Sequence, residues 1–302
     1  MVNAQRITRK KTQMNSALGR VALLALCLVS APVVLTAEEP AVISLSTQIT
    51  LGSYNNSAER SGYISEILAL TYQRPDDCSV TVTIKDSTLN WKQSPGGIHT
   101  VEPGIGLTRW ITISPEDLIG ITVAATRSTG DDSNSDQMIV PYVSIMGKRR
   151  DGSASVDLGY ARSNYTDTTV NQVTASYGFS FFDSRFWSRT RLYYLDLGDR
   201  PVEGMNNSTA IEQKLTWYAI PQKLSLTFSV LAGRRIHGYD PDIAAVYTVP
   251  DIQYGSGGVT IGYSVSPALH LYGDASYESY RKPSITNNYS VTYGTVGLMY
   301  VF

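Results

Sequence analysis

From Ala41 to the last residue, the sequence alternates apolar and polar positions with a period of two. In residues 259–265, for example, Val, Ile, Tyr and Val alternate with Thr, Gly and Ser. Side chains on an extended strand point alternately to its two faces, so each such segment has one apolar face and one polar or small-residue face. Fourteen segments show this pattern and few show helical periodicity. The sequence therefore predicts an all-β chain.

The connections between these segments alternate in length. Those after even-numbered segments are short: 74–77, 114–117, 148–152, 183–185, 221–223 and 266–267. Those after odd-numbered segments are longer and polar: 53–62, 86–98, 128–136, 164–169, 198–208, 236–256 and 281–288. Sorting of this kind places short turns at one rim and long loops at the other, which is typical of transmembrane barrels. Because an open edge cannot lie in hydrocarbon, we expect one closed up-and-down antiparallel β-barrel of about 14 strands, with 12 as the alternative.

The last segment, residues 292–302, carries a more specific pattern. One face of the strand would hold Val296, Leu298, Tyr300 and Phe302, and the other Thr295, Gly297, Met299 and Val301. This segment resembles the closing strand of bacterial outer-membrane β-barrels, which typically ends in Phe after alternating aromatic or apolar residues. The resemblance implies a place in the outer membrane of a Gram-negative bacterium. It also implies two partners, the lipid bilayer and the barrel-insertion machinery that reads the C-terminal strand.

The first 37 residues predict an export signal. Five basic residues and no acidic residue precede Glu38, and a short apolar run begins at Val21. A basic region, an apolar stretch and a small residue before a charge are typical of a secretory signal peptide. We expect a signal peptide over 1–37, cleaved after Ala37, and a barrel over 38–302. An uncleaved anchor over 21–37 is the alternative, although that stretch is at the lower limit for spanning a bilayer.

Composition excludes several classes of function. Without residues 1–37 the chain has 20 basic and 26 acidic residues, a net charge of −6, which does not suit nucleic-acid binding. Cys78 would be the one cysteine left, so no internal disulfide is expected. The sequence has no Cys-x-x-Cys-His haem attachment motif, and we expect neither a metal nor another cofactor.

Charged residues on the polar faces predict the lining of a lumen. A basic side chain facing lipid at mid-bilayer costs about 2–4 kcal/mol, so charges within strands should point inward. The predicted lumen-lining residues are Lys85, Asp157, Arg189, Arg191, Glu212, Lys214, Asp274 and Glu278. Those at 189, 191, 212 and 214 come from adjacent strands. They would form either a basic patch or a salt-bridge ladder, serving conduction or bracing of the wall.

Aromatic residues gather near the predicted strand ends. Trp110, Trp187, Trp217, Tyr300 and Phe302 fall near the short-turn rim, and Tyr54, Tyr160 and Tyr280 near the long-loop rim. Such positions predict two girdles of rings at the membrane interfaces. The alternative is that aromatic residues simply favour strands.

Catalytic residues are not evident. His270 is expected to face inward near the short-turn rim, whereas the outer-membrane hydrolases use an outward-facing Ser-His pair near the external rim. His237, Asp240 and Asp242 could gather at that rim as in a protease, but Asp-Pro-Asp is more often a turn. We expect no catalytic site and no enzyme.

Size and strand number resemble those of monomeric fourteen-stranded porins, which implies passive passage of small hydrophilic solutes through a small water-filled pore. Fourteen strands lie between barrels filled by side chains and barrels with an open channel, and the 236–256 loop is long enough to fold in and restrict the pore. Residues 159–162 and 192–196 are also similar to the YaiO-type outer-membrane barrels. The alternative function is a plugged or structural barrel, acting in surface polysaccharide export or as partner of a periplasmic complex.

Overall fold

A computed structural model describes residues 40–92, 97–131, 136–166, 168–198, 204–242, 245–246 and 251–302. The chain divides into two compact units, Met1–Pro40 and Ala41–Phe302, and the fold is that of the second. The predicted signal peptide, 1–37, lies outside the described residues and stays a prediction. Within the described ranges, no helix is long and apolar enough to cross a membrane.

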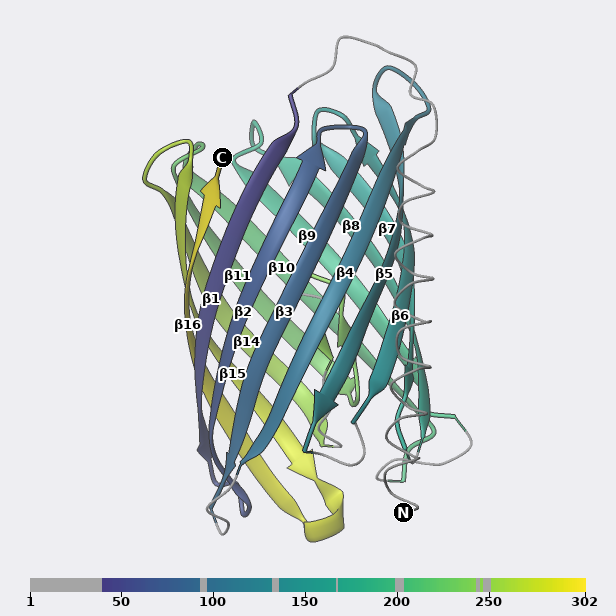
Figure 1. Cartoon of the computed structure of the whole chain (residues 1–302), viewed down its shortest axis with the longest axis vertical. Helices are drawn as coiled ribbons and strands as arrows, with labels where there is room; N and C mark the ends of the chain where they lie inside the picture. Colours follow the sequence, from purple (N-terminus) through teal and green to yellow (C-terminus); the bar gives the residue numbers. More distant parts are fainter. Residues whose placement is uncertain are drawn as a thin grey trace, which may run out of the picture. The chain divides into compact units, whose positions relative to one another are not determined.

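Fourteen antiparallel strands close into one barrel (Figure 1). The strands are β1 (Val42–Asn55), β2 (Arg60–Arg74), β3 (Cys78–Trp91), β4 (Ile98–Thr112), β5 (Asp117–Gly130), β6 (Met138–Arg149), β7 (Ala154–Asn164), β8 (Thr169–Phe181), β9 (Phe186–Asp196), β10 (Asn207–Ile220), β11 (Leu224–Arg235), β14 (Ile252–Ser264), β15 (Leu269–Lys282) and β16 (Asn287–Val301). Each strand pairs with its neighbours in sequence, except that β11 pairs with β14 and β16 pairs with β1. The predicted count of fourteen is confirmed, and the alternative of twelve is wrong.

The last strand closes the barrel against the first. In this pair Leu45 lies opposite Tyr300 and Ile49 lies opposite Val296, so apolar side chains of both strands share the outer face. The backbone N–H of Phe302 donates to the carbonyl oxygen of Ile43 at 2.9 Å, which continues the ladder to the C-terminus. Closure leaves neither β1 nor β16 with an unpaired edge, as a wall in hydrocarbon requires.

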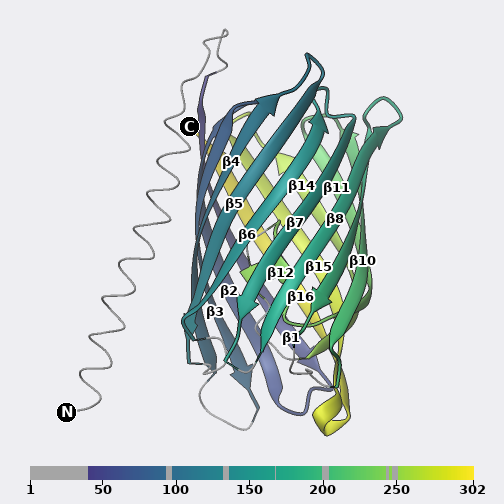
Figure 2. The same cartoon turned by 90° about the vertical axis from the view of Figure 1, so that its right-hand side faces the viewer.

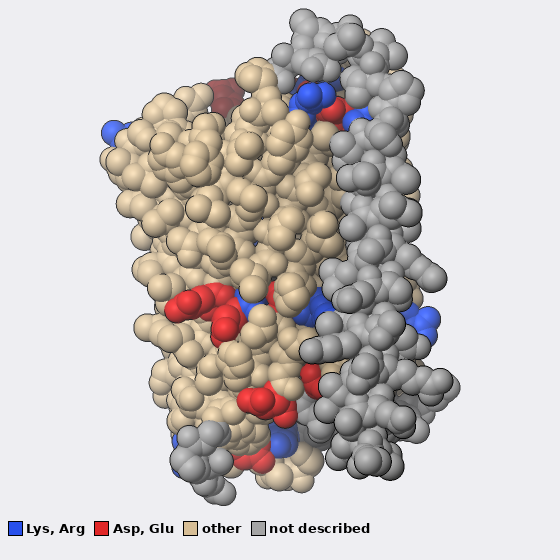
Figure 3. Space-filling view, in the orientation of Figure 1, with Lys and Arg blue, Asp and Glu red and all other residues tan. Residues whose placement is uncertain are grey.

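Large apolar side chains are exposed along the outside of the barrel. Leu51 is 57% exposed, Val82 50% and Val296 66%, and all three lie within strands of the barrel. On the face that Figure 3 shows, a broad band without charged side chains crosses the barrel between its two ends. Outward apolar residues at alternate positions are the expected surface toward lipid tails.

The two rims differ as the sequence predicted, but the strands are longer. The connections 75–77 and 221–223 represent the short-turn rim. At the other rim, β1 and β2 are joined by 56–59 instead of the predicted 53–62, because the polar residues on either side still pair in the ladder. The connection between β11 and β14, residues 236–251, carries the two-residue strands β12 (Tyr239–Asp240) and β13 (Ala245–Val246), which pair with each other. Figure 2 shows β12 within the outline of the barrel.

The outward face predicts how a charge will be tolerated. Val82→Arg places a guanidinium in the apolar belt of β3 and should lower the free energy of unfolding by about 2–4 kcal/mol. The matched control is Thr81→Arg, one residue away, whose side chain enters a lumen cavity and should cost much less. Urea unfolding in lipid vesicles measures both variants. Equal losses of stability in the two variants would show that the outer face does not contact lipid while the inner face contacts water.

Candidate functional site

The connection 236–251, here called the inward loop, turns back into the barrel. Its described residues are 236–242, 245–246 and 251. Ile236, His237, Tyr239, Val246 and Asp251 are all at most 4% exposed, although they belong to a connection at the long-loop rim. The sequence prediction that this loop folds in therefore agrees with its position, except that residues 252–256 belong to β14.

Gln172 of the wall and Tyr165 of the β7–β8 connection hold the start of the inward loop. Gln172, on β8, is 2% exposed, and its amide bonds the loop backbone twice: Nε2 donates to the carbonyl oxygen of Tyr239 at 2.7 Å and Oε1 accepts from its N–H at 2.9 Å. The ring of Tyr165 lies 4.3 Å from the ring of His237, and the Tyr165 hydroxyl donates to the His237 carbonyl oxygen at 3.3 Å. The side-chain amide of Gln172 thus acts as a strand partner for β12.

An apolar core lies between this loop and the inner wall. It consists of Met138, Val140, Tyr142, Ala161, Tyr165, Val170, Tyr193, Leu195, Leu197, Ala210, Leu231, Ile236, Tyr239, Val246 and Ile252. The rings of Tyr142 and Tyr239 are 5.2 Å apart. A polar inner face throughout was expected from the sequence, and this part of the wall differs because the loop replaces water there. Removing apolar surface from water stabilises a structure by about 25 cal/mol per Å². The packing of these side chains therefore helps to hold the loop in place.

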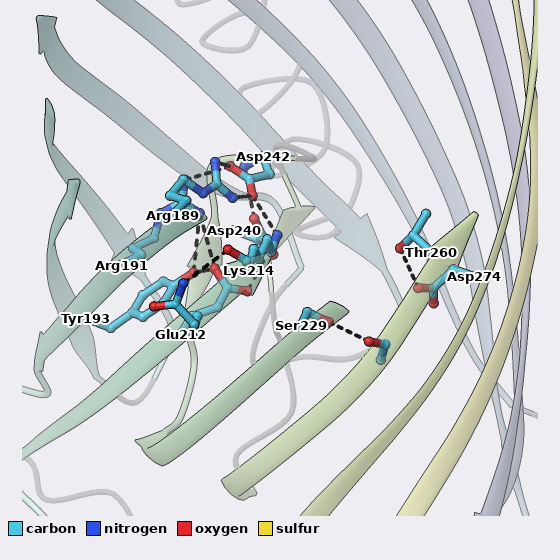
Figure 4. A network of polar contacts seen from close by, with 12 residues as sticks. Arg189, Arg191, Tyr193, Glu212, Lys214, Ser229, Asp240, Asp242, Thr260 and Asp274 are labelled. Atoms are coloured by element: carbon cyan, nitrogen blue, oxygen red, sulfur yellow. Dashed lines mark hydrogen bonds and ion pairs between the residues drawn. The ribbon is translucent and has the colours of Figure 1, made fainter. Parts of the chain in front are cut away.

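The turn of the inward loop presents an acid to three cations (Figure 4). The Asp242 carboxylate accepts from Arg191 Nη2 at 2.7 Å, from Lys214 Nζ at 2.9 Å and from Arg189 Nη1 at 3.2 Å, and Arg189 Nη2 bonds its other oxygen. Its own backbone N–H donates to the Asp240 carboxylate at 2.9 Å, which forms the turn expected for Asp-Pro-Asp. The turn therefore both reverses the chain and aims Asp242 at the wall.

Two of these cations, Arg191 and Lys214, also contact an acid of the wall. Glu212 lies 3.5 Å from Lys214 Nζ and 3.9 Å from Arg191 Nη1, and it accepts from the Tyr193 hydroxyl at 3.3 Å. Arg191 is 5% exposed, so removing either acid would leave a nearly buried guanidinium short of a partner. The arrangement is a salt-bridge network in which Asp242 supplies the acid that the wall lacks.

Electrostatics favour the ionised form of Asp242. Burial raises the pKa of its carboxyl, but the charges of Arg191, Lys214 and Arg189 outweigh burial and hold the pKa below its ordinary value. A lowered carboxyl pKa means that the attraction is fully present above the ordinary pKa and is lost only when the pH falls through the lowered one. The ion pairs of Asp242 with Arg189, Arg191 and Lys214 should therefore stay intact at about pH 4.

The inward loop crosses the lumen to two further walls. The backbone N–H of Val246 lies 3.4 Å from the carboxylate of Glu102 on β4, which also binds Lys85 of β3 at 3.3 Å. At the end of the loop, the Asp251 carboxylate forms an ion pair with Arg60 and accepts from the hydroxyl of Tyr289. Contacts on β8–β10, on β3–β4 and at the ends of β2 and β16 fix the loop around the circumference.

Two cavities lie in the lumen beside the described part of the loop. The first, about 300 Å³, lies between Tyr239 and Asp242 of the loop and the wall around Gln48. The second, about 440 Å³, lies toward the long-loop rim and is bounded by Val246 of the loop. Gln48 and Ile67 line both cavities, so the two adjoin along β1 and β2.

The structure places the predicted lumen residues inside the barrel in four groups. Arg189, Arg191, Glu212 and Lys214 form the network, and Asp157 is buried on β7, two strands away from β9. Lys85 pairs with Glu102. Asp274 accepts from Thr260 at 2.9 Å, and Glu278 lines the larger cavity. The network is thus a ladder braced by the loop, which resolves the choice between ladder and basic patch.

Sequence reasoning missed the residues that complete these groups. Glu102 has the same parity as the inward positions of its strand and could have been found by that signal. Arg60 and Asp251 fall in connections expected to be loops, where parity gives no direction. The Asp-Pro-Asp sequence marked a turn at Asp242, but nothing in it indicated the three cations.

The aromatic positions divide between the two faces. Trp217, Tyr300 and Phe302 are exposed on the outside near the short-turn rim, as expected. For Trp110 and Trp187 the prediction of a position at the membrane interface, outside the barrel, is wrong.

Glycine contacts show where those two indoles lie. The Trp110 ring covers Gly120, whose neighbours Ile119 and Ile121 point outward, and the Trp187 ring covers Gly178. Both rings therefore lie on the inner face of the wall. The prediction had placed them outside because it used their height along the barrel and not the parity of their positions.

Tyr160 is 39% exposed on the outer face near the long-loop rim. Tyr54 and Tyr280 instead line the larger cavity, so the ring girdle predicted at this rim is wrong for them.

The three His residues lie apart from one another. His99 bonds Asp86 at 2.9 Å, and His237 is buried in the inward loop. His270 Nδ1 lies 2.8 Å from Ser264 Oγ, but its Nε2 faces the carbonyl oxygen of Pro267 at 3.2 Å, where a hydrolase needs a carboxylate. In the described ranges no group of three or more His, Cys, Asp or Glu side chains could hold a metal ion. That the chain is no enzyme stays a prediction.

Removing the charge of Asp242 should loosen the inward loop. Asp242→Asn leaves Arg189, Arg191 and Lys214 with less acid, so hydrogen exchange at the Tyr239 amide should become faster by about tenfold or more. Asp274→Asn, another inward acid whose one described partner is Thr260, is the control and should leave this exchange unchanged. Exchange mass spectrometry measures both. Equal protection in the two variants would show that the ion pairs do not hold the loop.

No protein-family model matches the chain, and no curated protein matches it. Among solved structures, it is similar to a deltaS2S3 mutant of the TodX monoaromatic hydrocarbon channel, with a TM-score of 0.60, 9% identity and 90% of this chain and 93% of that chain covered. It is also similar to the toluene transporter TodX of Pseudomonas putida, with a TM-score of 0.57, 7% identity and 91% and 92% covered. A bacterial polysaccharide outer-membrane secretin gives 0.50, 10% identity and 87% and 98% covered. At these identities the likeness concerns architecture: the chain has the fold of outer-membrane β-barrel proteins.

Proposed function

We propose that this protein is an outer-membrane channel for passive passage of small hydrophilic solutes, narrowed by the inward loop to a path along one wall. The observation that carries the proposal is the pair of adjoining cavities, about 300 and 440 Å³, on the side of the lumen that the loop leaves free. Their shared lining, Gln48 and Ile67, supports a path beside β1 and β2.

The chemistry of this wall suits hydrophilic solutes. Hydroxyl groups pair across neighbouring strands: Thr71 with Thr81 at 3.1 Å, Thr108 with Thr122 at 2.8 Å. Thr81, Thr108 and Thr122 line the smaller cavity, together with Ser46 and Ser79. Hydroxyls exchange hydrogen bonds with water and with polar solutes at little cost, so a hydrated path is favoured over one for hydrocarbons.

The anchored turn gives this path one charged side. Asp242 lines the smaller cavity while the cations of the network lie behind it, on the wall. A solute passing the loop would meet a carboxylate already neutralised by three cations. We therefore expect weak ion selectivity that depends on the balance within the network.

A second function rests on the packing of the loop. Because the inward loop is held by an apolar core, it resembles a plug more than a mobile lid. The likeness in fold to a polysaccharide secretin supports a role in polysaccharide export. The alternative proposal is a plugged barrel acting in surface polysaccharide export or with a periplasmic partner. Silent planar bilayers together with a periplasmic protein that co-purifies would favour it.

Deleting the inward loop tests the narrowing directly. Replacing residues 238–250 by a short Gly-Ser link should raise single-channel conductance several-fold, because the loop no longer occupies the lumen. Asp242→Ala should give a smaller increase or more frequent opening, while Asp274→Ala serves as the control. Planar bilayer recording of refolded protein measures all three. Unchanged conductance after the deletion would remove the loop as the constriction.

Reversing one charge of the network should change ion selectivity. Lys214→Glu adds negative charge beside Asp242 and should shift the reversal potential toward cation preference in a salt gradient. Arg191→Glu should act in the same direction. Arg162→Glu makes the same change of charge on the exposed outer face and is the control. A shift of equal size in the control would mean that the network does not face the permeation path.

A further inference from the structure

The larger cavity has more aromatic rings in its lining than the smaller one. It occupies about 440 Å³ on the long-loop side of the inward loop. Its rings are Tyr54, Tyr63, Trp91, Tyr280, Tyr289 and Tyr293. Small-molecule sites in proteins are typically cavities of about 300–1,000 Å³, lined by apolar and aromatic groups with a few polar groups placed among them.

The five tyrosines form a panel on β1, β2, β15 and β16, in two groups of touching rings. Tyr280 and Tyr289 stack with their centroids 5.3 Å apart, and Tyr54 lies 5.9 Å from Tyr289. Tyr63 and Tyr293 meet edge to face at 5.9 Å. The panel is therefore preorganised by contacts among the rings.

Glycine at one wall position makes room for the panel. A Cβ atom at Gly52 would lie 2.8 Å from the Tyr293 ring and 3.1 Å from Tyr63 Cβ. Any side chain at that position would push the rings toward the cavity, so the glycine keeps them flat against the wall.

The cations that line this cavity each have an acid partner. Arg60 pairs with Asp251, Lys85 with Glu102 at 3.3 Å, and Lys282 with Glu59 at 2.7 Å. Glu278 adds a further carboxylate to the lining. An anionic ligand would have to compete with these acids for every cation. A hydrocarbon would displace water from the ion pairs without replacing its hydrogen bonds. The lining thus suits a ligand that is neutral, rich in hydroxyls and partly apolar.

We propose that this cavity binds a neutral saccharide, with a pyranose face lying on the tyrosine panel and its hydroxyls bonded to the ion pairs that line the same cavity. The C–H face of a sugar ring is apolar and its rim carries hydroxyls, which matches a tyrosine ring with its polar tip. Lys85, Glu102 and Glu278 supply donors and acceptors for the rim. The inference deepens the proposed channel, because it names the solute class that would pause before passing the loop.

Calorimetry on the full chain in an amine-oxide detergent tests the site, since a detergent with a sugar headgroup would compete. Maltose and cellobiose are the neutral probes, and galacturonate and benzyl alcohol are the anionic and apolar ones. We expect saturable binding of at least one neutral disaccharide, and at least tenfold weaker binding of the other two probes. Tyr293→Ala should weaken saccharide binding by about three- to tenfold, whereas Tyr293→Phe retains it within about twofold.

Tyr277→Ala is the matched control, because Tyr277 is 52% exposed on the outside of β15 and should leave binding unchanged. Tyr63→Ala is a second test should the Tyr293 variant fail to fold, which the gel mobility of unboiled protein reports. Preference for galacturonate or benzyl alcohol, no saccharide binding at millimolar concentration, or an equal loss in the control would each overturn the saccharide site. Binding does not require conduction, so an open channel without binding overturns only this inference, and binding without conduction overturns only the proposed channel.

Discussion

The need to pair every backbone polar group within hydrocarbon governs this structure. It forces the ladder between β1 and β16, and that closure separates an outside from an inside. Once the two sides are separated, period-two alternation assigns every strand residue to one of them. The exposed belt around Val82 and Val296 and the ion pairs of the lumen are consequences of the same closure.

Charges inside the barrel are arranged as pairs and networks. Arg191 on β9 and Lys214 on β10 need more acid than their own wall provides, and Asp242 supplies it from a connection distant from both in sequence. Breaking such an arrangement leaves a charge poorly solvated, which costs several kcal/mol when the group is deeply buried. The network therefore determines where the loop rests, and the loop determines which part of the lumen stays free.

Much of the fold could be predicted from the sequence because strand periodicity carries direction. Parity placed Arg189, Arg191, Glu212 and Lys214 together on the inner wall, and the terminal residues indicated closure. The prediction for Trp110 and Trp187 was wrong because the position of a residue along the barrel axis does not determine whether its side chain faces inward or outward. The path of the inward loop could not be predicted, since a connection has no period, and its contacts with Gln172 and Glu102 depend on three-dimensional packing.

The apolar packing of the inward loop is confined to one part of the circumference, which gives the barrel two unlike halves. Substitutions on β6–β10 would alter the seat of the loop, whereas substitutions on β1–β3 and β15–β16 would alter what a solute touches. Apart from Arg60, Lys85 and Tyr289, which hold the loop directly or through Glu102, the second set can change without disturbing the first. A barrel built this way could exchange one solute for another by replacing a few tyrosines or threonines, while its mechanical support stayed as it was.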